Sequence, residues 1–401
     1  MRRLTADEAA ERLGIKKTTL YAYVSRGVLQ SETAPDGRRS TFDAGEVETL
    51  ARRGRRADAP ASLDVVVVTE LTRIEDHRLH YRGRDAIELA RTARFEQVAE
   101  WLWRGAAADP WGRDLDPDGA VDGWRPRPGA VALARTVCNP IGRRTPADRL
   151  RVAIAALAAV DDLRFDLRPD AVADVGRSLL ATLATTLRAD GGSRGGVAAD
   201  VAAALVPDDH ERWVTPIERA LVLLADHELA TSTLAVRVAA STRADPYACL
   251  SAGLAAVSGP LHGSASTRAH RLLAEVDRPE RATAVVGDQL RLDGRVPGVG
   301  HTLYPEGDPR AVELMACLAE VANDGPAAEI VDAVLAAVGQ RTPTRPNIDL
   351  ALAALALHAG MELGATEAIF SLARCAGWLA HAMEEYEEAP LRFRARAVPR
   401  G

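Results

Sequence analysis

Apolar and polar residues follow different patterns in different parts of the chain. From about residue 84 onward, long segments carry apolar residues at the spacing of helices that bury one face. The stretch LDVVVVTELTRIEDHRLHYRG at 63–83 instead alternates as a pair of strands does, with a turn near Glu75 and Asp76. Residues 1–57 contain short helical and extended runs. The pattern predicts a mainly α protein preceded by a small domain.

The helix expected after Thr145 is the clearest single element. Pro146 suits the first helical turn, and Asp148 interacts favourably with the positive end of the helix dipole. The run DRLRVAIAALAAV then has the spacing of a buried face. The glycine-rich stretch ADGGSRGGVAAD at 189–200 lacks the GK[ST] ending of a phosphate-binding loop and follows no strand. We therefore expect it to connect two helices.

The N-terminal segment has the features of a winged helix-turn-helix domain. Thr5 and Glu8 are spaced as a capping box before an alanine-rich helix, and after a glycine turn Lys17 to Arg26 forms a second helix. A Pro-Asp-Gly turn at 35–37 between extended stretches indicates a hairpin, or wing, and Asp43 starts a third helix. The segment resembles the excisionase or MerR-like winged helix-turn-helix.

DNA is a candidate partner of this segment. The residues expected near DNA are Lys16, Lys17, Thr18, Thr19, Tyr21 and Tyr23 of the second helix, with Arg38 and Arg39 of the wing against phosphates. Residues 1–57 hold 12 Lys/Arg and 8 Asp/Glu, a balance of +4, which leaves −10 on the rest of a chain whose net charge is −6. A balance of +4 is small for a DNA-binding domain, so a structural or dimer-contact role stays open.

Composition limits the environment of the chain. Its 401 residues, 47% hydrophobic and 26% charged, suffice for two or three domains with a buried core. No apolar run is long enough to span a bilayer and no signal-peptide pattern is present, so we expect a cytoplasmic protein. Four cysteines without metal or disulfide spacing are expected to be small buried residues: Cys138, Cys249, Cys317 and Cys375.

Three of the nine histidines have unusual surroundings. His262 lies in GPLHGSAS and His301 in VPGVGHTLYPEGDPRA, both beside glycines that let the backbone bend and a ligand approach closely. His227 lies in DHELATST, just before a helical stretch. A single histidine of this kind is more often structural than catalytic. Three of them in one half of the chain favour a shared functional site.

Four charged residues each have two open interpretations. Arg310 follows an Asp-Pro helix start, where it either binds an anion or lies in solvent. Arg374 lies inside the apolar helix IFSLARCAGWLAHAMEE, so it needs a carboxylate or a bound ligand as partner. Arg392 belongs to the basic tail LRFRARAVPR and is either functional or simply solvated. Asp349, between RPN and LALAALALHAG, is either a helix N-cap or a carboxylate that faces a cleft.

Together these segments resemble the citrate synthase family. Four motifs stand in the family's order with similar separations: GPLHG at 259–263, PGVGH with DPRA at 297–311, PNID at 346–349 and LAR-x-x-GW-x-AH at 372–381. Upstream, LHYRG at 79–83 and FEQVAEWLWRG at 95–105 are also similar to that family. The resemblance implies an almost wholly helical fold in which a large and a small domain close over the substrates.

Approximate domain limits follow from the resemblance and from the N-terminal motif. They are a helix-turn-helix domain at 1–57, a linker at 58–62, a large domain at 63–258 and 352–401, and a small domain at 259–351. In such an enzyme, closure of the small domain excludes water until the new carbon–carbon bond has formed.

The resemblance also implies a role for each candidate residue. Asp349 matches the base that removes a proton from the acetyl methyl, His262 the group that hydrogen-bonds the thioester oxygen, and His301 the acid beside the oxaloacetate carbonyl. The residues that match the oxaloacetate clamp are His227, Arg310, Arg374 and Arg392. In the family the last of these reaches across a dimer interface, which implies a homodimer. Acetyl-CoA is the expected co-substrate, and neither a metal nor another cofactor is expected.

The implied pairing of these residues makes chemical sense. A methyl group beside a thioester is a very weak carbon acid and an aspartate is a weak base, so the developing enolate oxygen must be stabilised as the proton leaves. Guanidinium groups bind carboxylates bidentately, and a further histidine can polarise the ketone of the second substrate.

Several positions depart from the commoner family pattern: Ser264 and Ser266 after GPLHG, Thr302 after His301, and Ala230 where asparagine is usual. They leave the acyl-CoA open between acetyl-CoA, giving citrate, and propionyl-CoA, giving 2-methylcitrate, because a pocket distinguishes one methylene by only about 1–3 kcal/mol. A different hypothesis is a DNA-binding regulator that senses oxaloacetate or an acyl-CoA. The presence of Asp349, His262 and His301 together favours an enzyme, because a sensor has no use for a base that removes a proton from carbon.

Overall fold

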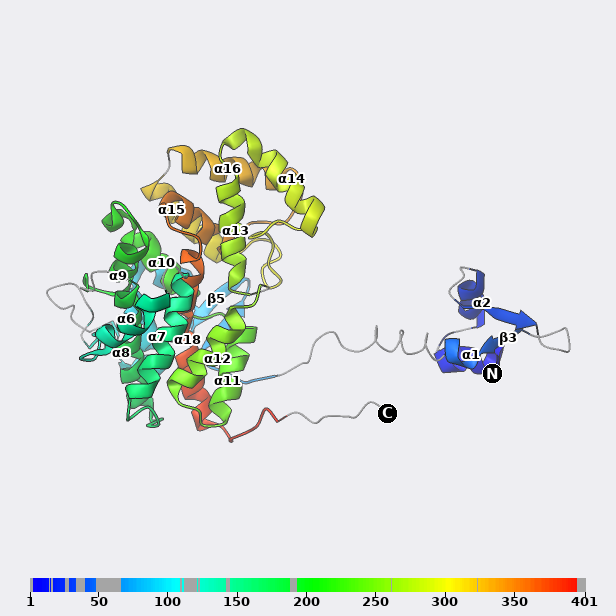
Figure 1. Ribbon diagram of the computed structural model, residues 1–401, viewed down its shortest axis with the longest axis horizontal. Helices are drawn as coiled ribbons and strands as arrows, with labels where there is room; N and C mark the ends of the chain where they lie inside the picture. The colour runs from blue at the N-terminus through cyan, green and yellow to red at the C-terminus, as the bar shows by residue number, and fades with distance from the viewer. Residues whose placement is uncertain are drawn as a thin grey trace. The chain divides into compact units, whose positions relative to one another are not determined.

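The computed structural model describes residues 3–13, 15, 17–25, 29–33, 40–47, 66–108, 110–111, 121, 123–141, 145–187, 193–260, 262–322 and 324–394. The chain divides into two compact units, Met1–Val68 and Thr69–Gly401, and each is described by itself (Figure 1). Within the described ranges, no helix combines the length and the apolar character that crossing a membrane requires.

The first unit contains two helices and a small antiparallel sheet. Its elements are β1 (Arg3–Thr5), α1 (Ala6–Leu13), α2 (Lys17–Ser25), β2 (Ser31–Thr33) and β3 (Ser40–Asp43), with strand order β1-β3-β2. Leu20, Leu29, Phe42 and Val47 are buried together and form a core of this unit's own. The helix pair with a following strand pair agrees with the predicted winged helix-turn-helix.

Two local predictions for this unit are confirmed. The Thr5 N–H donates to Glu8 Oε2 (2.8 Å) and the Glu8 N–H to Thr5 Oγ1 (3.3 Å), which is the reciprocal pattern of a capping box. Asp43 Oδ1 accepts two backbone N–H groups of the turn that follows, and residues 44–47 are helical. The wing turn at 35–37 lies outside the described residues.

The second unit begins with the predicted strand pair. The antiparallel strands β4 (Thr72–Glu75), β5 (Arg78–Tyr81) and β6 (Arg84–Asp85) form one sheet in that order. The turn between β4 and β5 lies at Asp76 and His77, both with positive φ, at the place that the sequence indicated.

Helices make up most of the rest of this unit, as the pattern predicted. They are α4 (Ala86–Thr92), α5 (Phe95–Arg104), α6 (Ala130–Cys138), α7 (Pro146–Val160), α8 (Pro169–Thr186), α9 (Val197–Leu205), α10 (Val214–Leu224), α11 (Thr231–Ser241), α12 (Pro246–Val257), α13 (Ser264–Glu275), α14 (Ala282–Asp293), α15 (Pro309–Val321), α16 (Pro326–Gly339), α17 (Ile348–His358) and α18 (Ala365–Glu387). Short 3₁₀ turns occupy Gly105–Ala108, Asn139–Ile141, His210–Trp213 and Pro279–Arg281. Thr145 caps α7 with Pro146 in its first turn. Of the glycine-rich stretch at 189–200, residues 193–196 precede α9 and residues 197–200 form its first turn, whereas 189–192 lie outside the described residues.

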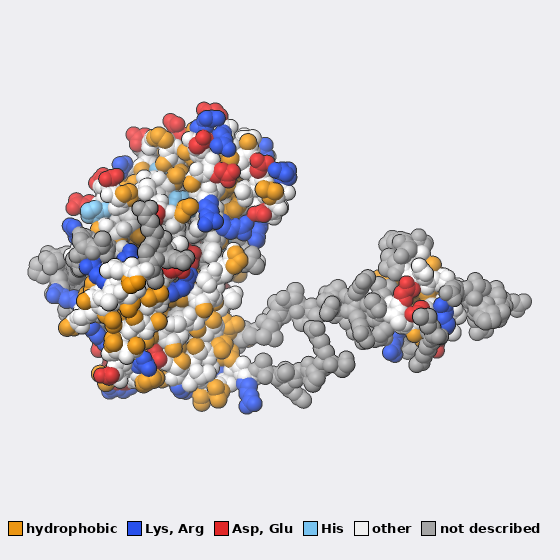
Figure 2. Space-filling model, viewed as in Figure 1, with side chains coloured by type: hydrophobic (Ala, Val, Ile, Leu, Met, Phe, Trp, Pro, Cys, Tyr) orange, Lys and Arg blue, Asp and Glu red, His pale blue; other side chains and the backbone are white. Residues whose placement is uncertain are grey.

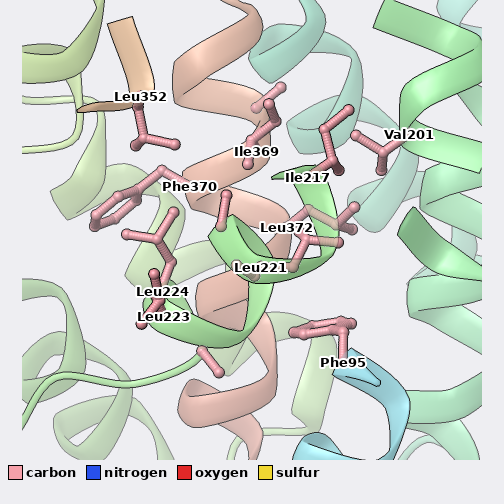
Figure 3. Close-up of a cluster of buried hydrophobic side chains, with 14 of the residues drawn as sticks. Phe95, Val201, Ile217, Leu221, Leu223, Leu224, Leu352, Ile369, Phe370 and Leu372 are labelled. Atoms are coloured by element: carbon pink, nitrogen blue, oxygen red, sulfur yellow. The ribbon is translucent and has the colours of Figure 1, made fainter. Parts of the chain in front are cut away.

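The long helix α18 lies at the centre of the second unit. It is apolar around most of its circumference, as a helix buried on all sides must be, and it packs against α5, α7, α8, α10, α11, α12, α13 and α17. Figure 3 shows part of the resulting core, where Phe95, Val201, Leu221, Leu352 and Phe370 bring five helices into one cluster. The four cysteines are buried and unbridged, as expected.

A glycine lets α18 approach the end of α10 unusually closely. The Gly377 N–H donates to the Ala225 carbonyl (3.0 Å), and a Cβ at Gly377 would lie 2.4 Å from that oxygen. On the same face of α18, the Arg374 Nε donates to the Leu224 carbonyl (2.8 Å) and His381 Nε2 lies 3.1 Å from Asp226 Oδ2. This contact fixes the backbone just before His227.

Candidate active site

Backbone pairing brings the loop before His301 next to the start of α17. The Asn347 N–H donates to the Gly298 carbonyl (2.9 Å), and the Asn347 side-chain amide donates to the Gly300 carbonyl (2.8 Å). Asn347 Oδ1 accepts the N–H of Asp349 (2.9 Å), so Asn347 is the N-cap of α17. The interpretation of Asp349 as the helix cap is therefore wrong. Its carboxylate is left for another role.

The Asp349 side chain has few stabilising contacts with the chain around it. Within the described residues its carboxylate has no hydrogen-bond partner, and it lines a cavity of about 150 Å³ together with Arg268, Arg295, Val296 and Pro297. Burial raises the pKa of Asp349 to about 6, against the opposing charges of Arg310 and Arg374. Such a group is ionised above pH 6 and is a stronger base than an exposed aspartate.

Asp308 joins the beginning of α15 to the beginning of α17. It caps α15 through the Arg310 N–H, and its two carboxylate oxygens accept Arg310 Nε (3.0 Å) and Nη2 (2.8 Å). Asp308 Oδ2 also accepts the N–H of Ile348 (3.0 Å), the residue before Asp349. Burial alone would raise the pKa of Asp308, but Arg310 holds it below its ordinary value. Arg310 is only 2% exposed, so its interpretation as a solvated arginine is wrong.

His227 and His301 lie against each other beside Tyr304. Their ring centroids are 5.3 Å apart, and His227 Nε2 is 3.1 Å from the Tyr304 hydroxyl oxygen. The Leu303 N–H donates to His301 Nδ1 (3.1 Å), so the neutral His301 ring carries its proton on Nε2 and donates from there. Burial and the Arg310 charge lower the pKa of both histidines, which favours neutral rings.

His262 is held by a serine that the sequence did not single out. Its Nε2 lies 2.8 Å from Ser232 Oγ in the first turn of α11, and its ring stands edge-on to Phe370 at 5.9 Å. Among the described residues, Nδ1 has no hydrogen-bond partner. Burial, with a contribution from Arg374, lowers the pKa of His262 to about 4, so the ring is neutral at physiological pH and can donate a hydrogen bond.

Arg374 is a buried cation that binds no carboxylate within the described part of the chain. It is 2% exposed, its guanidinium lies 4.8 Å from the Phe370 ring centroid, and its Nε binds a carbonyl. Burial lowers the pKa of Arg374, whereas the charge of Asp226 opposes that effect. Its terminal nitrogens are therefore available to an anionic ligand, as expected for an arginine on an apolar helix face.

Six predicted residues form one connected set in this unit: His227, His262, His301, Arg310, Asp349 and Arg374. Arg392 is not part of it. Its Nε donates to Glu385 Oε1 (2.7 Å) on α18, and its guanidinium lies beside Phe393. The tail arginine is thus ion-paired rather than simply solvated.

In the first unit, α2 exposes part of the predicted DNA-binding set. Lys17, Thr18 and Tyr21 are exposed, whereas Thr19 and Tyr23 are partly buried. Lys17 Nζ lies 2.6 Å from Asp7 Oδ1, so one of the predicted cations has a carboxylate partner. Lys16, Arg38 and Arg39 lie outside the described residues.

Comparison with known proteins agrees with this arrangement. Residues 63–396 match the family described as "Citrate synthase, C-terminal domain", and residues 3–55 match a helix-turn-helix domain. The chain belongs to the citrate synthase family. It is an enzyme of the citrate synthase type with an N-terminal helix-turn-helix domain.

Relatives of the family cover most of the chain. A citrate synthase from Haloferax volcanii is 31% identical over 341 residues, which cover 80% of this chain and 89% of the relative. A 2-methylcitrate synthase from Corynebacterium glutamicum is 26% identical over 348 residues, covering 79% and 88%. Among solved structures, citrate synthases from Thermotoga maritima and Thermoplasma acidophilum share the fold with TM-scores of 0.64 and 0.66 at 23% identity. They cover 84% and 86% of this chain, and 94% and 96% of their own.

Proposed function

We propose that this enzyme condenses acetyl-CoA with oxaloacetate and water to give citrate and CoA, without a further cofactor. The observation that carries the proposal is Asp349, a carboxylate without a hydrogen-bonded partner among the described residues, beside a cavity and within the fields of Arg310 and Arg374. The Thermoplasma acidophilum citrate synthase was solved as a ternary complex with carboxymethyl coenzyme A and oxaloacetate, which supports both substrates.

The first step forms an enol from the thioester. Asp349 removes a methyl proton while His262 Nδ1–H donates to the thioester oxygen, so that negative charge does not build up on an unassisted oxygen. Ser232 at the opposite nitrogen keeps the His262 ring oriented for this role. The raised pKa of Asp349 reduces the mismatch between a carboxylate base and a weak carbon acid.

The second step forms the carbon–carbon bond. The enol carbon attacks the oxaloacetate ketone, and His301 Nε2–H donates to the ketone oxygen as it becomes the hydroxyl of citryl-CoA. Arg374, whose terminal nitrogens have no hydrogen-bond partner in the described part of the chain, binds the two carboxylates together with Arg310 and His227. Water then hydrolyses the citryl thioester and releases CoA.

Arg268 and Arg295 line the cavity and suit the phosphates of a CoA thioester, although Arg268 Nη2 also donates to Asp293 Oδ2 (2.6 Å). The described residues of the lining do not separate an acetyl from a propionyl group, and relatives bear both names. The second candidate is therefore 2-methylcitrate formation from propionyl-CoA. CoA thiol release, measured with each thioester in the presence and absence of oxaloacetate, tests both.

Three outcomes of that assay are distinct. Oxaloacetate-dependent release that is lost in Asp349→Ala supports the condensing enzyme, and the faster thioester identifies its substrate. Release without oxaloacetate would indicate a simple thioesterase and contradict the proposal. If neither thioester reacts although oxaloacetate raises the melting temperature, the sensor hypothesis is favoured instead.

We also propose that the first unit binds double-stranded DNA. The support is the helix-turn-helix match and the exposed side chains of α2: Lys17 and Thr18 lie at its start, the part of a recognition helix that contacts bases, and Tyr21 lies in its middle. Binding of the full chain to genomic DNA fragments should weaken as salt rises, and Thr18→Asp should weaken it further. Binding that is equal in the variant and independent of salt would contradict this role.

We further propose a homodimer. Within its own chain Arg392 contacts Glu385 rather than the site, so a role in oxaloacetate binding requires a second copy. Val160, Leu163 and Phe165 at the end of α7 are 61–75% exposed, and Figure 2 shows hydrophobic side chains gathered where α7, α11 and α12 lie. Light scattering should give twice the chain mass, and Phe165→Glu should lower it. A monomer with full turnover would contradict the proposal.

A further inference from the structure

Tyr304 is a buried phenol in the loop between His301 and Asp308. It is 1% exposed, and the sequence motifs gave it no role. The loop has no regular structure at this point, so the position of the side chain is set by what it contacts and not by a helix or a strand.

The contacts of Tyr304 are with three residues of the proposed oxaloacetate site. Its hydroxyl oxygen lies 3.1 Å from His227 Nε2, its ring centroid is 4.9 Å from that of His301, and the Arg310 guanidinium lies 5.5 Å from the ring centroid. Within the described ranges, it is the one side chain with a ring or hydrogen-bond contact to all three. His227 follows α10, whereas Arg310 starts α15, so Tyr304 joins separate parts of the unit.

Protonation decides the direction of the hydrogen bond. Burial raises the pKa of Tyr304 to about 12, so its hydroxyl keeps its proton at neutral pH. Burial and the charges of Arg310 and Arg374 hold the pKa of His227 well below its ordinary value, so that ring is neutral. Between a neutral phenol and a neutral imidazole, the phenol is the better donor, and Nε2 accepts.

We propose that Tyr304 is a positioning residue of the oxaloacetate site: its hydroxyl fixes the ring orientation and tautomer of His227, and its ring spaces His301 from Arg310. This inference rests on the proposed oxaloacetate-binding role of these residues. Without the hydroxyl, His227 Nε2 would be buried without a partner, and the imidazole would rotate or change tautomer. The binding geometry for a dicarboxylate would then be lost in part of the population.

Tyr304→Phe tests the hydroxyl alone, because it keeps the ring against His301 and Arg310. We expect the KM for oxaloacetate to rise about tenfold, the effect of leaving one buried hydrogen-bonding group unpaired. The KM for the acyl-CoA should stay within about twofold, and kcat should change less than the oxaloacetate KM. Tyr304→Leu also removes the ring and should lower kcat as well.

Tyr247→Phe is the matched control. Tyr247 is also a buried tyrosine with a hydrogen-bonded hydroxyl, but its hydroxyl donates to the Asp161 carboxylate (2.7 Å) and not to a residue of the site. This variant should leave both KM values unchanged. Long-range ¹H–¹⁵N spectra of the histidine rings, with the His227 signal assigned by His227→Gln, give a second readout. Wild-type Nε2 should show the shift of an unprotonated acceptor nitrogen, and Tyr304→Phe should show a mixture of tautomers.

The outcomes separate this inference from the function on which it rests. If the wild type turns over but Tyr304→Phe has an unchanged oxaloacetate KM and unchanged His227 signals, the positioning role is overturned. If the wild type shows no turnover, calorimetric binding of oxaloacetate replaces the KM. About tenfold weaker binding by Tyr304→Phe would then support the inference even though the enzymatic proposal fails, and equal binding would overturn it.

Discussion

Replacing Asp349 by asparagine should slow turnover strongly and stabilise the fold at the same time. Loss of a general base lowers rates by about 10²–10⁴-fold. Burial lifts the Asp349 pKa from 3.8 to about 6. At about 1.4 kcal/mol for each unit of pKa, ionised Asp349 therefore costs the folded state about 3 kcal/mol of stability. Because the carboxylate borders a cavity that water can enter, we expect about 1–3 kcal/mol of added stability in Asp349→Asn.

The stability that Asp349→Asn gains over the wild type should increase with pH and should not decrease at any pH. A carboxyl whose folded-state pKa exceeds its unfolded value stabilises the fold below the unfolded value, and that stability is lost as pH rises through about 6. Asparagine cannot ionise, so Asp349→Asn avoids this loss. The difference in unfolding free energy between variant and wild type should therefore grow from about pH 4 to about pH 6 and then stay constant.

Denaturant unfolding at a series of pH values, at equal protein concentration, measures this difference. All six tryptophans lie between residues 101 and 378, so their fluorescence reports on the second unit. Asp308→Asn is the matched control, because Asp308 is buried and bound to Arg310 whereas Asp349 is half-buried, and breaking that pair should destabilise by about 3–5 kcal/mol at neutral pH. An Asp349→Asn variant less stable than wild type at pH 8, or an advantage independent of pH, would refute the reasoning.

Further predictions concern the same unit. The kcat/KM should fall as pH drops through about 6, in step with protonation of Asp349, in a pH–rate profile. Gly377→Ala should destabilise by about 1–3 kcal/mol in denaturant unfolding, because its Cβ would lie 2.4 Å from a backbone oxygen, whereas Gly287→Ala on α14, with open space around it, should stabilise by about 0.5–1 kcal/mol. Ser232→Ala should lower kcat about tenfold with little change in KM, by steady-state kinetics. Arg374→Lys should raise the oxaloacetate KM more than tenfold, because an ammonium cannot bind a carboxylate bidentately.

The sequence predicted the element types well because local signals and tertiary packing agree. The Thr5 capping box, the Thr145 cap with its following proline and the turn at Asp76 all depend on residues a few positions apart. Two local predictions for charged residues were less complete. Asp349 has the spacing of a cap, but Asn347 two residues earlier has that role, and Arg310 turns back onto the aspartate that precedes it instead of facing solvent.

The partners of the candidate site could not be predicted in the same way, because they are distant in sequence. Ser232 contacts His262, 30 residues away in the sequence, and Tyr304 contacts His227, 77 residues away. Contacts at such separations produce no periodic pattern that the sequence alone could reveal. His381 contacts Asp226, which lies 155 residues earlier in the chain. Both residues belong to the motifs that we interpreted, but the interpretation concerned other residues of those motifs. These contacts exist only once α18 has packed against the end of α10.

The sequence of α18 nevertheless contains a signal that explains why the site forms there. In a helix that is apolar around most of its circumference, Arg374, Gly377 and His381 recur at intervals of three and four, and so share one face. A buried face that combines a cation, a glycine and an imidazole cannot be satisfied by apolar packing. It requires a backbone that approaches closely and presents carbonyl and carboxylate oxygens. The end of α10 supplies both, through Leu224, Ala225 and Asp226, and His227 follows directly. The same contact that satisfies α18 therefore places the first histidine of the site.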